Sequence, residues 1–210
     1  MKLKKFTYFY PEKPVLILIE SEAFKKFSDD PDYIAEPKFN EQRCELHLIN
    51  GVAHFWNRHG KELDYNKNAS YAEGKKVITQ IFVDKFGDMG YFIFDTGLRH
   101  NKVSGINNKL VIYDIHVYKD EVLNQLTFEE RRNILEGYFK KNNDVDDTVH
   151  LIHQHPDNFK KWFQYYTDGS NEFEGLVMKN KKGKLKLGKV SASDSTWMFK
   201  VRIQTGRHRY

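Results

Sequence analysis

The sequence predicts an α+β fold that is rich in strands, with helices placed between them. Short apolar runs with strand spacing occur along the whole chain, and several longer segments have the apolar spacing of helices. The two kinds do not alternate as regular strand–helix–strand units, which argues against a doubly wound parallel sheet. With 210 residues the chain fits one substantial domain that can bury a real core.

The first part of the chain predicts a strand, a helix and then a β-meander. The run VLILI at 15–19 indicates a short buried strand, and the stretch after it places Phe24 and Phe27 on one side of a helix. Strand-like segments fill residues 34–63, where the dipeptide at 50–51, Asn-Gly, is a typical hairpin turn.

The middle of the chain predicts two helices and two buried strands. Apolar residues recur at helical spacing within 69–86, whereas 91–95 and 109–118 are apolar runs of strand length. Thr127, with Glu130 three residues later, forms a capping box that predicts the start of a second helix.

The last part predicts a helix over 158–169 and then three strands joined by turns of lysine and glycine. This lysine hairpin could hold a phosphate backbone or could be a solvated strand edge. Its basic residues are Lys181, Lys182, Lys184, Lys186 and Lys189.

Two clusters before this part could suggest metal sites. His150 and His153 would share one face of a helix, with His155 close by, but no fourth zinc ligand is evident, and a polar helix end explains them better. The acidic stretch 144–147 has neither the glycine nor the final glutamate of a calcium loop and indicates a solvated turn.

Charge and cysteine content limit the classes of function. Lys and Arg exceed Asp and Glu by 34 to 29, for a formal charge of +5 and a pI near 9.0, which favours anionic partners such as nucleotides or nucleic acid. The single cysteine, Cys44, excludes disulfides within the chain. The apolar run 15–19 is too short for export or for crossing a membrane, so we expect a soluble cytoplasmic protein with no membrane partner.

Five short segments carry side chains suited to nucleotide chemistry. They are PKFNEQR at 37–43, NRHGKEL at 57–63, VIYDIHV at 111–117, EGLVMK at 174–179 and WMFKVR at 197–202. A nucleophilic lysine such as Lys38 needs its pKa lowered by burial or by neighbouring positive charge, and cations elsewhere in the fold could supply that charge.

In order and approximate spacing, these segments resemble the motifs of the covalent nucleotidyltransferases, which comprise ATP-dependent DNA ligases, RNA ligases and mRNA capping enzymes. The family patterns are K-x-D-G-x-R, S-R-x-G-K, F-D-x-x, E-G-x-V-x-K and K-x-K or K-x-R. The resemblance covers residues 36–202. It implies a ligase adenylation domain, built from two antiparallel β-sheets with flanking helices and a nucleotide cleft between them.

The resemblance also implies a domain organisation. Residues 1–210 would be a single nucleotidyltransferase domain, without the OB-fold domain that follows it in DNA ligases and capping enzymes. The chain would then be a minimal, bacteriophage-like enzyme, a truncated one, or a protein whose partner supplies an OB-type domain.

The resemblance gives the charged residues catalytic roles. Lys38 would attack the α-phosphate of ATP and form a lysyl-AMP intermediate. Lys200 and Arg202 would clamp the phosphate oxygens and lower the pKa of Lys38. Glu174 would serve the Mg²⁺ that accompanies ATP, because hard cations prefer carboxylate oxygens.

The remaining matched residues would bind the nucleotide. Tyr113 would stack on the adenine, although a tyrosine in an apolar run can equally belong to the core, and Glu36 would read the adenine amino group. Arg43 and Arg58 would contact the ribose or the nucleic acid, and Lys179 would contact the nucleotide.

The sequence departs from the family pattern at two places. Asn40 and Glu41 replace the usual Asp-Gly after the lysine. FIFDTGLRH at 92–100 falls where ligases carry D-G-E-L, so Gly97 stands where a glutamate for the ribose is usual. Asp95 or His100 could take over ribose recognition.

The expected activity is that of an ATP-dependent DNA ligase, which uses ATP and Mg²⁺ to seal nicked duplex DNA during replication or repair. An RNA ligase of the same superfamily is the second possibility, and a catalytically inactive nucleic-acid-binding relative is the third. A capping enzyme fits less well, because Glu36 suits adenine better.

Overall fold

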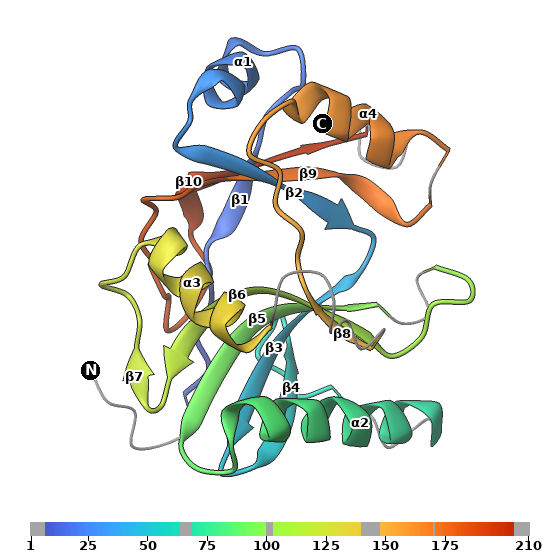
Figure 1. Cartoon of the computed structure of the whole chain (residues 1–210), viewed down its shortest axis with the longest axis vertical. Coiled ribbons are helices and arrows are strands. Elements are labelled where there is room, and N and C mark those ends of the chain that lie inside the picture. Colours follow the sequence, from blue (N-terminus) through green and yellow to red (C-terminus); the bar gives the residue numbers. More distant parts are fainter. Residues whose placement is uncertain (1–6, 64–68, 100–102, 140–147, 170, 204–210) are drawn as a thin grey trace.

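Two β-sheets stand one above the other in the computed structural model, with helices on their outer sides (Figure 1). The structure describes residues 7–63, 69–99, 103–139, 148–169 and 171–203. One sheet has four strands in the order β1-β10-β9-β2. The other has six, in the order β4-β3-β5-β6-β7, with β8 pairing to β6.

The four-stranded sheet takes its strands from both ends of the chain. Helices α1 and α4 lie above it in Figure 1, and their apolar residues pack with those of the sheet into one core cluster that includes Phe24, Phe159 and Leu176. The elements are β1 (Lys13–Leu16), α1 (Glu22–Asp29), β2 (Tyr33–Phe39), α4 (Phe159–Thr167), β9 (Phe173–Asn180) and β10 (Asp194–Arg202).

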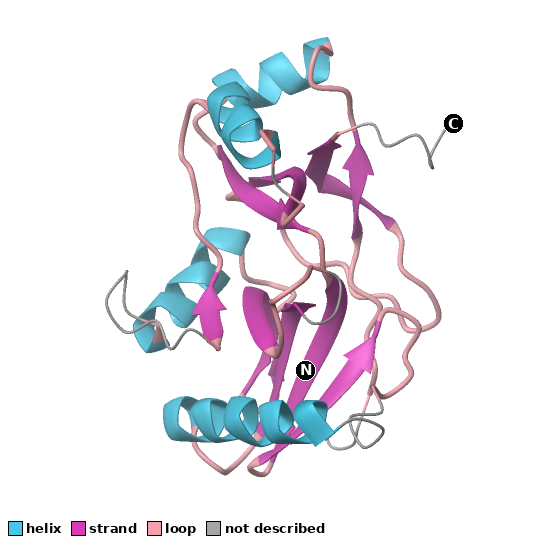
Figure 2. Ribbon diagram, turned by 90° about the vertical axis from the view of Figure 1, so that its right-hand side faces the viewer, coloured by secondary structure: helices cyan, strands magenta, loops and turns pink. Residues whose placement is uncertain are grey.

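The six-stranded sheet comes from the continuous middle of the chain. Every residue of its central strand β5 is buried, and Phe82 and Leu135 from two helices pack into the core on one side (Figures 1 and 2). The elements are β3 (Gln42–Ile49), β4 (Val52–Asn57), α2 (Ala69–Phe86), β5 (Tyr91–Arg99), β6 (Lys109–Tyr118), β7 (Glu121–Val122), α3 (Phe128–Tyr138) and β8 (Val149–Leu151).

Most local predictions are confirmed. The turn between β3 and β4 has positive φ at both Asn50 and Gly51, 46° and 77°, as a two-residue hairpin requires. Helix α2 occupies the predicted residues, and the capping box at the start of α3 is present, with Thr127 and Glu130 bonding to each other's backbone.

The structure differs from the predictions in some details at longer range. Most strand pairs are antiparallel, as predicted, but β1 runs parallel to β10 and β8 runs parallel to β6. Each of these pairs joins segments that no tight turn connects, so the antiparallel preference of hairpins does not apply. The first strand also covers 13–16 and not 15–19; Ile17 and Ile19 instead pack beside the core under α1 and α4.

The predicted third strand in the last part of the chain is also absent from the described residues. Between β9 and β10, Lys184 makes a single bridge to Thr127 and Gly188 makes one to Tyr10. Leu185 and Leu187 pack into two different core clusters, so this segment pairs with neither of its neighbouring strands.

None of the described helices is long and apolar enough to cross a membrane.

Candidate active site

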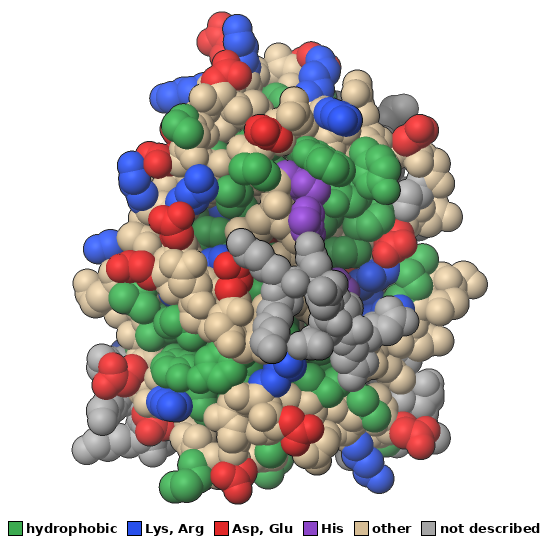
Figure 3. All heavy atoms as spheres, in the orientation of Figure 1, with side chains coloured by type: hydrophobic (Ala, Val, Ile, Leu, Met, Phe, Trp, Pro, Cys, Tyr) green, Lys and Arg blue, Asp and Glu red, His purple; other side chains and the backbone are tan. Residues whose placement is uncertain are grey.

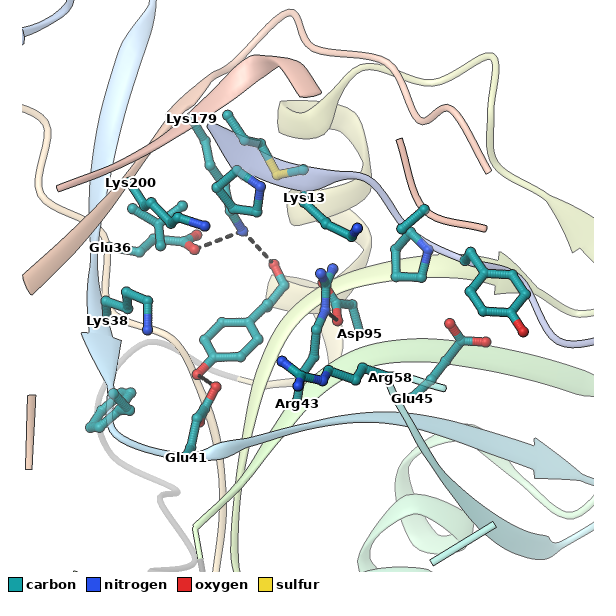
Figure 4. A pocket seen from close by; sticks show the side chains of 18 of the residues that line it. Lys13, Glu36, Lys38, Glu41, Arg43, Glu45, Arg58, Asp95, Lys179 and Lys200 are labelled. Atoms are coloured by element: carbon teal, nitrogen blue, oxygen red, sulfur yellow. Dashed lines mark hydrogen bonds and ion pairs between the residues drawn. The ribbon is translucent and has the colours of Figure 1, made fainter. Parts of the chain in front are cut away.

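A cavity of about 680 Å³ opens between the two sheets, where the chain passes from β2 to β3 (Figure 4). Its walls come from the segment before β1, the end of β2, the start of β3, and the facing strands β9 and β10. The charged side chains that line it are Lys13, Glu36, Lys38, Glu41, Arg43, Glu45, Arg58, Asp95, Lys179 and Lys200.

Lys38 stands near the end of β2, opposite Gly175 of β9. Its ammonium nitrogen donates a hydrogen bond to the carboxylate of Glu174, and both side chains remain partly exposed, at 25% and 32%. Gly175 has a φ of 145°, and a Cβ there would overlap the carbonyl oxygen of Val201. Glycine after Glu174 therefore allows β9 and β10 to approach closely beside the lysine.

Lys200 lies on β10 and points into the cavity beside Lys38 (Figure 4). Burial lowers the pKa of Lys200, and the positive charges of Lys38 and Arg202 lower it further. Arg202 is two residues further along β10, opposite Gly175. Two predicted site residues, Glu174 and Arg202, are not among the described residues that line the cavity. Glu174 nevertheless contacts Lys38, which does line it.

Glu36 is almost fully buried, with 1% of its surface exposed, in the wall of the cavity. One carboxylate oxygen is 2.7 Å from Nζ of Lys179, and the other accepts a hydrogen bond of 2.9 Å from Gln154. Nζ of Lys179 also lies 3.4 Å from the carbonyl oxygen of Tyr113 (Figure 4). Lys179 thus compensates the buried charge of Glu36 and ties β9 to β6.

Tyr113 turns its ring into the cavity, and its hydroxyl donates a hydrogen bond to the carboxylate of Glu41. Burial raises the pKa of Glu41 to about 8, and it raises the pKa of Tyr113 well above its usual value, with the charge of Glu41 adding to the effect. The aromatic ring predicted to stack on a base is therefore held at its hydroxyl end by a buried carboxyl group.

Arg43 and Asp95 form a bidentate pair across β3 and β5, with N–O distances of 2.8 and 2.7 Å. Burial alone would raise the pKa of Asp95, but the adjacent guanidinium lowers it below its usual value. Arg58 follows β4 on an exposed turn, where its Nε lies 3.1 Å from Nε2 of His59. Both arginines, predicted to contact ribose or nucleic acid, line the cavity.

A family model described as "ATP dependent DNA ligase domain" matches residues 18–201. The chain belongs to this family. The predicted fold class, a ligase nucleotidyltransferase domain with two sheets and flanking helices, is confirmed.

Solved structures agree with this assignment at the level of the fold. A mycobacterial DNA ligase D complexed with ATP and MES superposes with a TM-score of 0.57 at 12% identity, covering 82% of this chain and 55% of that one. A Chlorella virus DNA ligase-adenylate gives 0.52 at 14%, covering 92% and 68%. An archaeal ATP-dependent RNA ligase gives 0.54 at 12%, covering 90% and 47%.

This ligase domain spans about half the length of the ligase D chain that it matches. No curated protein matches its sequence significantly.

The five matched segments of the ligase domain come together around the cavity, as expected if they form one site. Three residues of the site were missed by sequence reasoning. Lys13 of β1 and Gln154 after β8 lie outside the matched segments, and no sequence signal marks them. The sequence analysis named Glu41 only as a departure from the family pattern. His100, one alternative for ribose recognition, lies outside the described residues.

The histidines of the ligase domain do not form the predicted helical face. His150 is in strand β8, and His155 follows in an extended segment, where it stacks on Trp162 at 3.8 Å and contacts the hydroxyl of Tyr166 at 2.8 Å. In Figure 3 histidine side chains lie among hydrophobic ones on the upper part of this face. In the part of the chain that the structure describes, no three His, Cys, Asp or Glu side chains are grouped to hold a metal ion. The acidic stretch 144–147 falls outside that part.

The lysine hairpin is partly engaged with the protein itself. Lys181 bonds to the carbonyl oxygen of Pro31 at 2.9 Å, and Lys182 pairs with the carboxylate of Asp32. These contacts tie the turn after β9 to the start of β2.

Proposed function

We propose that the chain is an ATP-dependent DNA ligase, which carries AMP on Lys38 and seals a 5′-phosphate to a 3′-hydroxyl in nicked duplex DNA. The observation that carries the proposal is the position of Lys38. Its amine lies in a cavity between two sheets, next to the carboxylate of Glu174 and beside the cation Lys200.

In the first step, Nζ of Lys38 attacks the α-phosphorus of ATP. A nitrogen–phosphorus bond forms, the bond between the α-phosphorus and pyrophosphate breaks, and Nζ gives up protons until one hydrogen remains in the N–H of the phosphoramidate. Glu174 already accepts a hydrogen bond from this nitrogen and is placed to receive a proton. Lys200 stabilises the charge on the phosphate oxygens, because phosphoryl transfer depends mainly on positioning and charge neutralisation.

Arg202 supports this step from a second position. Its charge contributes to the lowered pKa of Lys200, so the two cations act on each other along β10. A phosphate that binds at Lys200 relieves this repulsion, which favours anion binding at that place.

Glu174 fits a Mg²⁺ ion that arrives with ATP. Proteins usually hold Mg²⁺ by one or two carboxylates and by the phosphates of the substrate, and not by a complete cage. Glu174 offers one such carboxylate, with 32% of its side chain exposed. When bound, the ion would neutralise phosphate charge and polarise the phosphorus–oxygen bond.

The adenine fits the wall formed by β2, β6 and β9. Glu36 has a carboxylate oxygen that can accept from the adenine amino group, and Lys179 holds that carboxylate in place. The ring of Tyr113 offers a stacking surface, with Nζ of Lys179 5.7 Å from its centre. Arg43 and Arg58 line the opposite side, where ribose or nucleic acid would lie.

In the following steps the AMP passes from Lys38 to an oxygen of the 5′-phosphate, and the 3′-hydroxyl then attacks that phosphorus and displaces AMP. The first product is an adenylated end and the second is a phosphodiester bond. Solved DNA ligases and an RNA ligase both share this fold, so the polynucleotide has to be tested directly.

The test is incubation of the purified chain with α-labelled ATP, and separately GTP, in the presence of Mg²⁺, followed by denaturing electrophoresis. We expect a labelled band with ATP, no band in Lys38→Ala, and an unchanged band in Lys26→Ala, a control lysine exposed on α1. The same protein should then seal nicked duplex DNA. Sealing of RNA alone would make the chain an RNA ligase. No label with either nucleotide would refute the proposal and favour an inactive nucleic-acid-binding relative.

A further inference from the structure

The chain between β8 and α4 runs from the six-stranded sheet to the four-stranded sheet, past the edge strand β2 (Figure 1). Its backbone is fixed on both sides. Ile152 donates to the carbonyl oxygen of Ile112 on β6 at 3.0 Å, and His155 exchanges two hydrogen bonds with Ala35 on β2, at 2.8 and 2.9 Å. Gln154 lies between these two attachments, so its side chain has a defined position next to the residue that follows Ala35.

The side chain of Gln154 donates to the buried carboxylate of Glu36. Nε2 of Gln154 is 2.9 Å from Oε1 of Glu36, while Oε2 of Glu36 is 2.7 Å from Nζ of Lys179. Figure 4 shows Glu36 and Lys179 facing each other in the wall of the cavity. Glu36 lines the cavity, whereas Gln154 is not among the described residues that do so. Gln154 therefore acts on the cavity only through Glu36.

The charge of Glu36 determines which end of the Gln154 amide faces it. An ionised carboxylate only accepts hydrogen bonds, so the amide nitrogen and not the amide oxygen must point toward it. Donors on both oxygens favour the charged form of the carboxyl group and prevent its rotation. Lys179 alone would hold one oxygen and leave the other without a donor. Gln154 thus completes a group that accepts hydrogen bonds and cannot donate them.

Purines differ at the position that such an acceptor would meet. A 6-amino purine, such as adenine, presents an N–H donor there, whereas a 6-oxo purine, such as guanine or hypoxanthine, presents an acceptor. Each carboxylate oxygen has two acceptor positions, so Glu36 can bind an amino group and keep its contacts with Gln154 and Lys179. A 6-oxo group would instead face a negative charge. A site built to accept from an N–H group strongly rejects an analogue that lacks it.

We propose that Gln154 is a positioning residue that makes the site select a 6-amino purine over a 6-oxo purine. This inference rests on the proposed function, because it requires a purine nucleotide in this cavity. Gln154 keeps Glu36 charged and in one orientation. Without this donor, Oε1 of Glu36 would have no partner among the described residues, and the carboxyl group could rotate or bind a proton. A protonated carboxyl group can donate to a 6-oxo group, so the preference would become weak.

The experiment measures the binding of three ribonucleoside 5′-monophosphates by calorimetry at pH 7.5. AMP carries a 6-amino group, inosine 5′-monophosphate carries a 6-oxo group, and purine riboside 5′-monophosphate carries neither. A monophosphate has no pyrophosphate to lose, so it is not transferred to Lys38. The chain is first incubated with pyrophosphate and Mg²⁺, which convert any AMP already held on Lys38 to ATP, and is then dialysed.

Two variants of Gln154 separate its donor from its shape. Gln154→Met removes the donor and keeps an unbranched side chain of similar length. Gln154→Lys supplies a different donor to Glu36 from the same place. Gln80→Met is the matched control, because Gln80 on α2 also donates to a carboxylate, that of Asp84 at 2.6 Å, and is not among the described residues that line the cavity.

We expect the original chain and Gln80→Met to bind AMP about 100-fold more tightly than inosine monophosphate, with purine riboside monophosphate between them. Gln154→Met should reduce the preference for AMP over inosine monophosphate to about 10-fold or less, and Gln154→Lys should keep it above about 30-fold. A residue with a purely structural role would weaken the binding of all three nucleotides equally and leave their ratios unchanged.

The proposal is overturned if Gln154→Met keeps the original ratio, or if Gln154→Lys loses as much of it as Gln154→Met. It is also overturned if the original chain shows no preference or binds none of the three nucleotides. Labelling with ATP tests the ligase activity separately. A chain that is labelled, and whose preference does not depend on Gln154, refutes only this inference. A preference that depends on Gln154 in a chain that is never labelled refutes only the ligase activity.

Discussion

The buried pair of Asp114 and Arg131 should be among the most sensitive points of the fold. Arg131 on α3 is fully buried, and its guanidinium makes two bonds of 2.9 and 2.8 Å to the carboxylate of Asp114 on β6. It also donates to the carbonyl oxygen of Leu126 at 2.7 Å. Asp114 directly follows Tyr113, so the pair fixes the strand that carries the aromatic ring of the site.

We expect Asp114→Ala to lower the free energy of unfolding by about 3–5 kcal/mol. Two charge-assisted hydrogen bonds contribute about 1.5–3 kcal/mol each, and removal of one partner of a buried ion pair leaves an uncompensated charge at a similar cost. A domain of ordinary stability, about 5–15 kcal/mol, would lose a large fraction of it.

Urea denaturation followed by tryptophan fluorescence at pH 7 measures this difference. The double variant Asp114→Leu/Arg131→Met removes both charges, so it should be clearly more stable than Asp114→Ala. A loss below about 1 kcal/mol in Asp114→Ala, or a double variant no more stable than the single one, would show that the pair does not hold β6 to α3 in this way.

Three further predictions concern single positions. Gly175→Ala should cost about 1–3 kcal/mol, because of the positive φ and the Val201 carbonyl, and it should weaken labelling by ATP. Gly137→Ala should instead stabilise the protein by about 0.5–1 kcal/mol, since the surroundings of this residue in α3 are open. Urea denaturation of both glycine variants measures these differences. Burial lowers the pKa of His155 from 6.5 to about 4. Between these two values the unfolded chain binds a proton at this residue and the folded chain does not. The free energy of unfolding should therefore fall by about 2 kcal/mol from pH 7 to pH 5. Urea denaturation of His155→Gln at the two pH values should show no such loss. If the variant loses as much stability as the original chain, His155 is not the cause of the pH dependence.

Local features of the fold could be predicted because their determinants are close in the sequence. The Asn-Gly turn, the capping box and the spacing of apolar residues in α2 each act within a few residues. The segment 184–189 looked like a strand for the same local reason. Its two leucines, Leu185 and Leu187, are partly buried, but they pack against different clusters and not within a strand pair.

The candidate site could be predicted in part, because the family pattern names side chains but not their neighbours. The sequence placed Lys38, Glu174 and Lys200 in matched segments, and the structure brings these segments together. It could not indicate that Lys179 would pair with Glu36, because the order of strands in the sheet is a property of the whole chain. Nor could it place the carboxylate of Glu41 over a glycine more than fifty residues away in the chain.

The four-stranded sheet has a consequence for the order in which the molecule forms. Lys38 and Glu174 are separated by 136 positions, whereas all strands of the six-stranded sheet come from residues 42–151. Contacts between distant parts of a chain cost more loop entropy than local ones, so we expect the larger sheet to form first during synthesis on the ribosome. The lysine would meet its carboxylate only after β9 and β10 had emerged. An incomplete chain could then be partly folded and still have no means to take up a nucleotide.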